Sequence, residues 1–491
     1  MTMKDFKDIK SLLFNNLNTR QTIFKNVFWL TLSLGISKLF GLVLLIYAAR
    51  ILGAEEYGKF NFALAFVSMF VIFYSFGMPT IVTREFAKDK EKKENFYSII
   101  SLQCLLTLIG FGLILFTSFF ITTDLYVRKI ILILALFSLI NGFITIFYAF
   151  FQARQKMERQ AWLEMFQFLM IFLFGFYVLF TLPSAQNLSY AYFFSALIAF
   201  SAVLLFFHFK IFPLKIKFDS FIWKKFLLMA WPLALSGLFG AIYHYTDSVM
   251  MGYWDLMTET GWYHAAYKIV MVSLIPMGLI SSSFYPALSK FSEQGKEKFQ
   301  KACNYQIEIM IFLALPLIVG GTALASKIIY AFYPLDFSPA SLVFQILIFA
   351  TGIIFLYRPF YDALVVFNKQ KKLFWATLSG AGINVILNFI LIPRYSLYGA
   401  ALATFITNLL ILIIIVILIK KYTFVIFPFK RIFLTFLASG FASFLMYIFI
   451  KQLMPINIFV LVFLAVVVYF FIFFSLRKFV LLKFFKHVYQ N

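Results

Sequence analysis

The sequence predicts an all-α polytopic membrane protein with 14 transmembrane helices and both termini in the cytoplasm. Its composition is the first reason: the 491 residues are 63% hydrophobic and 13% charged, whereas an ordinary soluble domain is about half apolar. The second reason is that fourteen apolar stretches alternate with short polar connections. The third is that most of the positive charge falls in every second connection, which the positive-inside rule assigns to the cytoplasm.

Each apolar stretch is long enough to cross roughly 30 Å of hydrocarbon at 1.5 Å per residue. We expect the first six helices over residues 24–49, 60–83, 97–120, 130–152, 161–182 and 188–209. The second six follow at 225–251, 263–288, 302–324, 340–366, 373–393 and 396–419. A final pair at 432–451 and 456–476 contains no acidic residue and is interpreted as an addition. The connections are short, so no extramembrane domain is expected.

The positive charge lies almost entirely on one side of the predicted membrane. Of the 43 basic residues, 33 lie in the two terminal segments and the even-numbered connections, and only eight lie in the odd-numbered ones. An anionic inner leaflet is the expected neighbour of such loops. A net charge of +23 would suggest nucleic acid as the partner of a soluble protein, but here membrane lipid accounts for it and no nucleic acid is expected.

The chain divides into five expected regions. They are an amphipathic cytoplasmic leader, an N-terminal six-helix bundle, a cytoplasmic linker, a C-terminal six-helix bundle, and helices 13 and 14 with a basic cytoplasmic tail. Their bounds are 1–23, 24–209, 210–224, 225–419 and 420–491.

Weak internal similarity supports the division into two bundles. Gly53 and Gly58 enclose an acidic turn after the first helix, and Gly252 and Gly261 enclose another after the seventh. A correspondence between helices 1 and 7 preserves orientation, so the bundles would be parallel repeats around a central cavity. Chance similarity between glycine-punctuated turns is the alternative.

Charged side chains inside the predicted helices are candidate functional residues, because a charge in a bilayer is costly unless it is paired or hydrated. Lys38 lies near the middle of helix 1, and Asp247 lies in the most polar run of any helix. Asp247 could hold H⁺ or Na⁺, or form a structural pair with Lys38. Glu308 would be protonated or hydrated. Arg358 and Asp362 stand four residues apart and can neutralise each other.

Uncharged polar groups form a second set of candidates. Asn384 and Asn388 share one face of helix 11. Their amides suit sugar hydroxyls, but they suit bonds to a neighbouring helix equally well.

Signatures of catalysis are missing from the sequence. It contains no P-loop, no HExxH and no GxSxG. Cys104 and Cys303 show no metal-binding spacing. We therefore expect no enzyme, no metal and no cofactor, apart from a possible coupling ion.

Three runs carry a resemblance to a known family: Ala49–Phe60, the segment from Gly77 to Glu85, and Thr246–Gly252. They resemble the Wzx-type repeat-unit flippases of the multidrug/oligosaccharidyl-lipid/polysaccharide superfamily. The resemblance implies a two-lobed transporter in the bacterial plasma membrane. It would move undecaprenyl-pyrophosphate-linked oligosaccharide to the outer leaflet by alternating access, for O-antigen, capsule or exopolysaccharide. A polysaccharide polymerase and a chain-length regulator are the protein partners that it suggests.

The resemblance also bears on the site. Relatives that move the peptidoglycan precursor carry a basic residue on helix 1 in a Ser-basic-x-x-Gly setting, which here reads Ser37-Lys38-Leu39-Phe40-Gly41. The expected substrate-binding residues are Lys38, Arg84, Arg358, Asn384 and Asn388. The expected ion-coupling residues are Asp247, Glu308 and Asp362. A cation-coupled multidrug antiporter and a polysaccharide polymerase or ligase are the alternative functions.

Overall fold

The structure is a computed structural model that describes residues 12–88, 93–425, 429–453 and 456–488. Within these residues every regular element is a helix. Twelve of the helical stretches there are long and apolar enough to cross a membrane, which confirms the predicted class. The first eleven residues of the expected leader and the last three of the tail lie outside the described residues. The exact number of fourteen crossings and the cytoplasmic location of the termini stay predictions.

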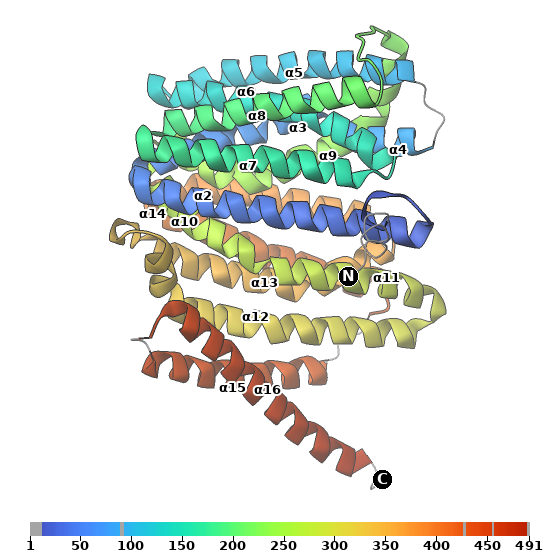
Figure 1. Ribbon diagram of the computed structural model, residues 1–491. Helices are drawn as coiled ribbons and strands as arrows, with labels where there is room; N and C mark the ends of the chain where they lie inside the picture. The colour runs from blue at the N-terminus through green and yellow to red at the C-terminus, as the bar shows by residue number, and fades with distance from the viewer. Residues whose placement is uncertain (1–11, 89–92, 426–428, 454–455, 489–491) are drawn as a thin grey trace, which may run out of the picture. The chain divides into compact units, whose positions relative to one another are not determined.

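The described residues form two compact units, which divide after Gly261. The first unit contains eight helices and the start of a ninth (Figure 1). They are α2 (Thr19–Met69), α3 (Val71–Ser75), α4 (Met78–Ala87), α5 (Lys93–Ile121), α6 (Leu125–Ala153), α7 (Met157–Thr181), α8 (Ala185–Lys210), α9 (Ser220–Tyr253) and the first turn of α10 (Met257–Ser273). Helix α9 packs against α2 in this unit. The expected boundary between two six-helix bundles at residues 210–224 stays a prediction.

Helix α2 is too long for one crossing, because 51 residues would extend about 75 Å at 1.5 Å per residue. A non-helical residue, Gly53, divides it, with φ 76° and ψ 174°. The left-handed φ is open to glycine at little cost. The two parts of α2 therefore match the predicted helix 1 and the start of helix 2.

Predicted helix 2 is less regular than expected, since α2, α3 and α4 succeed one another within it. Phe76 and Gly77 both have left-handed φ angles, 46° and 68°, and Pro79 stands in the first turn of α4. Proline is favoured at a helix start and cannot donate a backbone hydrogen bond. Pro276 has the same role at the start of α11, which interrupts predicted helix 8.

The connections of the first unit gather at two opposite helix ends. At one end, the Glu56 carboxylate accepts hydrogen bonds from the Tyr126 hydroxyl at 2.7 Å and the Ala185 amide at 2.9 Å, which joins the first, third and fifth connections. At the other end, Tyr97 donates to the Pro213 carbonyl at 2.9 Å, which joins the second to the sixth. Helices that cross a membrane in alternating directions place their odd-numbered connections at one end and their even-numbered connections at the other, as is seen here.

The second unit contains the remaining helices. They are the rest of α10, α11 (Ile275–Gln294), α12 (Lys296–Phe332), the short η1 (Leu335–Phe337), α13 (Ala340–Val366), α14 (Gln370–Tyr422), α15 (Phe429–Gln452) and α16 (Ile458–Val488). Helices α12 and α13 lie side by side, as do α15 and α16 (Figure 1). Helix α14 is divided at Ser396, where φ is 51° and ψ is −131°, so it covers predicted helices 11 and 12.

Helices α15 and α16, the appended pair, pack on α12. Their contact is an apolar cluster that includes Leu324, Met446 and Phe473. Tyr469 brings a polar group to this contact: its hydroxyl lies 2.6 Å from both the Phe312 carbonyl and the Ser439 hydroxyl. This satisfied tyrosine fixes how the pair sits on α12.

Candidate functional site

Lys38 stands near the middle of the first segment of α2, and its side chain is exposed. Among the described residues it makes no hydrogen bond or ion pair, so the structural pair with Asp247 is not formed there. The glycines on either side, Gly35 and Gly41, have nothing within 4 Å of where a Cβ atom would stand. The surface around Lys38 is therefore open enough for a bulky ligand to approach the ammonium group.

Arg84 lies in the last turn of α4 and already has a carboxylate partner. Its Nε atom is 2.8 Å from Glu85 Oε1, and one of its Nη atoms approaches the sulfur of Met229 at 3.3 Å. Lys88 shares the same carboxylate at 3.1 Å. About half of the Arg84 side chain is exposed. This arrangement suits a helix-end ion pair, and a substrate phosphate would have to compete with Glu85.

Arg358 and Asp362 form the centre of a buried polar cluster in the second unit. The Arg358 Nε atom is 3.0 Å from Asp362 Oδ1 and 3.0 Å from the Ser281 hydroxyl. Asp362 also accepts hydrogen bonds from Ser281 at 2.5 Å and from Gln306 at 2.8 Å. The carboxylate is 3% exposed, so this set of partners compensates for the loss of water around its charge.

Glu308 on α12 faces an arginine from the appended pair. Arg431 Nε lies 3.5 Å from Glu308 Oε1, and the glutamate side chain is largely buried. The sequence alone suggested a protonated or hydrated carboxylate. The structure instead places the Arg431 guanidinium beside this carboxylate.

Asp247 is buried in α9 among Thr246, Ser248 and Val249. The Thr246 hydroxyl bonds back to the Ile242 carbonyl at 2.6 Å. A buried carboxylate in a spanning helix is a candidate for holding a cation or a proton. Its ion-coupling role stays a prediction, as do those of Glu308 and Asp362.

Asn384 and Asn388 are both buried on α14 and bond to each other. Asn388 donates to the Asn384 side-chain oxygen at 3.0 Å, and Asn384 Nδ2 is 3.5 Å from the Thr407 hydroxyl on the second segment of the same element. The pair thus links the two segments of α14. That geometry favours the interpretation as bonds between helices over direct contact with sugar.

Two residues of the Asp362 cluster were not found from the sequence. Ser281 and Gln306 are common polar residues, and nothing in their local pattern shows that they face a carboxylate on another helix. A buried glutamine in the polar first half of α12 is a weak signal, because amides inside a membrane usually find a partner.

Comparison with known proteins agrees with this fold. Residues 23–292, more than half of the chain, match the family described as "Polysaccharide biosynthesis protein", and residues 232–390 match the family MatE. The "Capsular polysaccharide biosynthesis protein CapF" of Staphylococcus aureus is 22% identical over 391 residues, 77% of this chain and 94% of that protein. The "Probable low-salt glycan biosynthesis flippase Agl15" of Haloferax volcanii is 23% identical over 171 residues, 35% of this chain and 36% of that protein.

Among solved structures, the lipid II flippase MurJ in an inward closed conformation has a similar fold. The TM-score is 0.76 at 17% sequence identity, covering 93% of this chain and 100% of that one. At this identity the likeness shows the fold alone. The family match covers nearly all of α2, all of α3 to α10 and most of α11, including the turns that carried the resemblance in the sequence. The chain therefore belongs to the polysaccharide biosynthesis protein family.

Proposed function

We propose that this chain is a flippase, and not an enzyme, in the bacterial plasma membrane. Its substrate would be an undecaprenyl-pyrophosphate-linked oligosaccharide repeat unit, moved from the cytoplasmic to the outer leaflet by alternating access. The product would be capsule or another surface polysaccharide. The observation that carries the proposal is Lys38, an exposed cation near the middle of a spanning segment with no ion pair among the described residues.

The physical argument starts from the cost of exposing such a cation to lipid. An ammonium group in the middle of hydrocarbon costs several kcal/mol, so its surroundings must be hydrated or occupied by an anion. A sugar headgroup is also costly to move through lipid, because each unpaired hydroxyl costs several kcal/mol in an apolar medium. A hydrated path lined by Lys38 removes both costs, while the polyprenyl tail stays in the lipid.

The relatives support the same class of substrate. CapF is named for capsular polysaccharide biosynthesis, and Agl15 is named as a probable flippase of glycan biosynthesis. The structural relative MurJ is named as a flippase of lipid II. A polysaccharide polymerase and a chain-length regulator would act after the unit arrives outside, and they stay proposed partners.

Within this proposal Lys38 holds the pyrophosphate by charge-assisted hydrogen bonds. Arg84 and Arg358 are weaker candidates, because each already contacts a carboxylate. Asn384 and Asn388 would contribute to sugar contact only after their mutual bond opens. Asp247 is the first candidate for the coupling H⁺ or Na⁺, because it is buried within the most polar run of any predicted helix.

The experiment measures lipid-linked oligosaccharides in cells that lack this protein, with access to each leaflet probed from outside. Export predicts that undecaprenyl-linked units accumulate on the inner leaflet and that surface polysaccharide is lost. If the units reached the outer leaflet and stayed unpolymerised, a polymerase or ligase activity would replace flippase activity as the proposed function of this chain.

A second candidate function is a cation-coupled small-molecule antiporter. The match of residues 232–390 to the MatE family favours it. The same cells separate the two: an antiporter predicts unchanged lipid-linked sugars together with increased sensitivity to toxic cations.

A further inference from the structure

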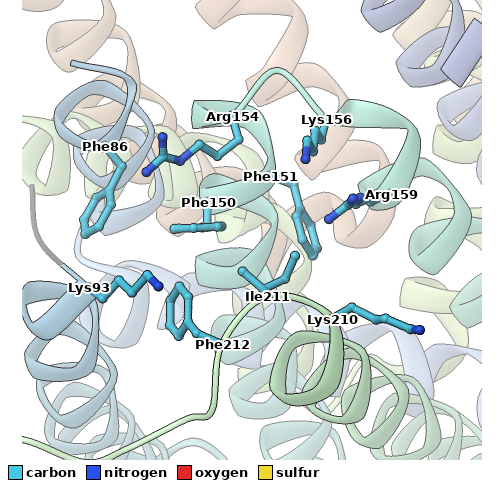
Figure 2. Close-up of a pocket in the computed structure, with 10 residues that line it drawn as sticks. All are labelled: Phe86, Lys93, Phe150, Phe151, Arg154, Lys156, Arg159, Lys210, Ile211 and Phe212. Atoms are coloured by element: carbon cyan, nitrogen blue, oxygen red, sulfur yellow. The ribbon is translucent and has the colours of Figure 1, made fainter. Parts of the chain in front are cut away.

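A pocket of about 420 Å³ lies among helix ends of the first unit, and basic side chains surround it (Figure 2). Five of its ten lining residues are cationic and the rest are aromatic or aliphatic. They are Lys93, Arg154, Lys156, Arg159 and Lys210, with Phe86, Phe150, Phe151, Ile211 and Phe212. None of these described lining residues is acidic. We call this site the basic pocket.

The sequence builds the basic pocket from three connections that are far apart along the chain. Lys93 is the first residue of α5, and Lys210 is the last residue of α8. Arg154 caps the end of α6, and Lys156 caps the start of α7. All belong to connections that the positive-inside rule assigns to the cytoplasmic side. The fold brings basic residues from Lys93 to Lys210 together around one concave site at the expected headgroup level.

Two acidic residues that lie close to the pocket along the chain hold other cations, and Glu94, which follows Lys93, is exposed and does not line the pocket. Glu158, which follows the α6–α7 turn, is 2.8 Å from the fully buried Lys25. Glu85, which precedes Phe86, holds Arg84 at 2.8 Å and Lys88 at 3.1 Å. Glu158 and Glu85 are therefore shared with cations that do not line the pocket.

The surroundings of Lys156 in the basic pocket disfavour its charged form. Burial and then the neighbouring guanidinium of Arg159 lower the pKa of Lys156 below its ordinary value, and Lys25 and Arg154 act in the same direction. Glu158 opposes them without reversing the result. Helix dipoles do not account for this effect, because α5 and α7 begin here while α6 and α8 end here, so their end charges offset one another.

Aromatic rings hold the cations at the rim of the pocket. The Lys93 ammonium lies 5.5 Å from the centroid of the Phe212 ring, and the Arg154 guanidinium lies 5.8 Å from that of Phe150. Arg159 rests in the same way on Phe206, at 5.5 Å. Cation–π contacts of this kind are weak at exposed sites. They position these three cations at the rim of the pocket.

We propose that the basic pocket binds the headgroup of a membrane lipid that carries two phosphate groups. Four of the lining cations, Lys93, Lys156, Arg159 and Lys210, exceed what one phosphodiester neutralises, and a zwitterionic headgroup would leave them unbalanced. Basic pockets between spanning helices on the cytoplasmic side are suited to such headgroups. Two lipids offer this chemistry, a bisphosphate phospholipid such as cardiolipin and a polyprenyl diphosphate. The binding is independent of whether the chain translocates glycan.

The test measures binding to the purified full-length protein by native mass spectrometry and by titration in detergent. The probes are cardiolipin, undecaprenyl diphosphate, phosphatidylcholine and inorganic pyrophosphate. The pocket variant combines Arg154→Gln, Lys156→Gln and Arg159→Gln. The matched control combines Lys215→Gln, Lys217→Gln and Lys224→Gln, three exposed lysines of the same predicted face that do not line the pocket.

We expect the pocket variant to lose at least tenfold in affinity for a two-phosphate lipid while the control stays within twofold. Binding should also weaken with salt, because the contact is electrostatic. A tighter complex with cardiolipin would identify a resident phospholipid, and a tighter complex with undecaprenyl diphosphate would identify a docking site for the proposed substrate.

Equal losses in the two triple variants would overturn the proposal, because they would show diffuse attraction to the whole basic face. Inorganic pyrophosphate binding as tightly as the lipids would also overturn it. If the triple variant unfolds, Lys156→Gln and the conservative Lys156→Arg replace it. The proposal then requires that Lys156→Arg retain the affinity that Lys156→Gln loses.

Discussion

Gly58 and Gly261 make reciprocal contacts: each lies against the backbone of the turn that contains the other. A Cβ atom on Gly58 would lie 1.7 Å from the carbonyl oxygen of Met257, and one on Gly261 would lie 2.0 Å from that of Ala54. Each glycine thus touches the residue four positions before the other. A two-fold relation between two segments produces such reciprocal contacts. This supports the interpretation of the two glycine-rich turns as repeats rather than as chance similarity.

We predict that Gly58→Ala and Gly261→Ala each reduce stability, because a Cβ atom cannot be accommodated against a fixed backbone carbonyl. Overpacking of this kind costs about 1–3 kcal/mol or more. The measurement is the thermal unfolding midpoint of the purified variants. Gly112→Ala on α5 is the matched control, since nothing lies within 4 Å of its added Cβ. A midpoint unchanged in all three variants would show that the backbones separate easily.

Lys25 and Glu158 form a buried ion pair at 2.8 Å, with the lysine side chain fully covered. Removing one partner of such a pair leaves a buried charge without compensation, at a cost of about 3–5 kcal/mol. We therefore expect Lys25→Met and Glu158→Gln each to lower the unfolding midpoint strongly. The double variant should recover much of the loss. Additive losses in the double variant would contradict a direct pair.

Substitution of Lys38 should impair transport without affecting folding. A hydrogen bond to a charged group contributes about 1.5–3 kcal/mol, so Lys38→Gln should weaken substrate binding about ten- to a hundredfold. Lys38→Arg should retain most activity because the charge remains. Lys129→Gln, which removes another exposed lysine, is the control. The assay is outer-leaflet exposure of lipid-linked oligosaccharide, and wild-type rates for Lys38→Gln would remove Lys38 from the mechanism.

Asp247 and Asp362 should respond differently to the same change. Asp362→Asn leaves Arg358 without its carboxylate, so we expect a stability loss of about 1–3 kcal/mol. Asp247→Asn should retain the fold and lose the dependence of transport on the ion gradient. Transport in vesicles with an imposed H⁺ or Na⁺ gradient, together with unfolding midpoints, measures both. Full gradient-driven transport by Asp247→Asn would assign the coupling ion to another group.

The sequence predicted the positions of the helices closely, but it did not predict where helices are interrupted. The predicted helix at 340–366 coincides with α13 (Ala340–Val366), because apolar length is a local property of the chain. The break of predicted helix 2 at Phe76 and Gly77 was missed. Gly77-Met78-Pro79 was visible as a motif, but a glycine takes a left-handed conformation only where the neighbouring packing favours it.

By itself the sequence determined the class, the family and the alternation of charge, since these depend on composition and on short runs of residues. It also marked Arg358 and Asp362 as a pair, because four residues on a helix bring side chains to one face. Only the tertiary structure decided that Ser281 and Gln306 complete that cluster, that Arg431 faces Glu308, and that five distant cations surround one pocket. Those contacts depend on which helices become neighbours, and the packing of the whole chain decides that.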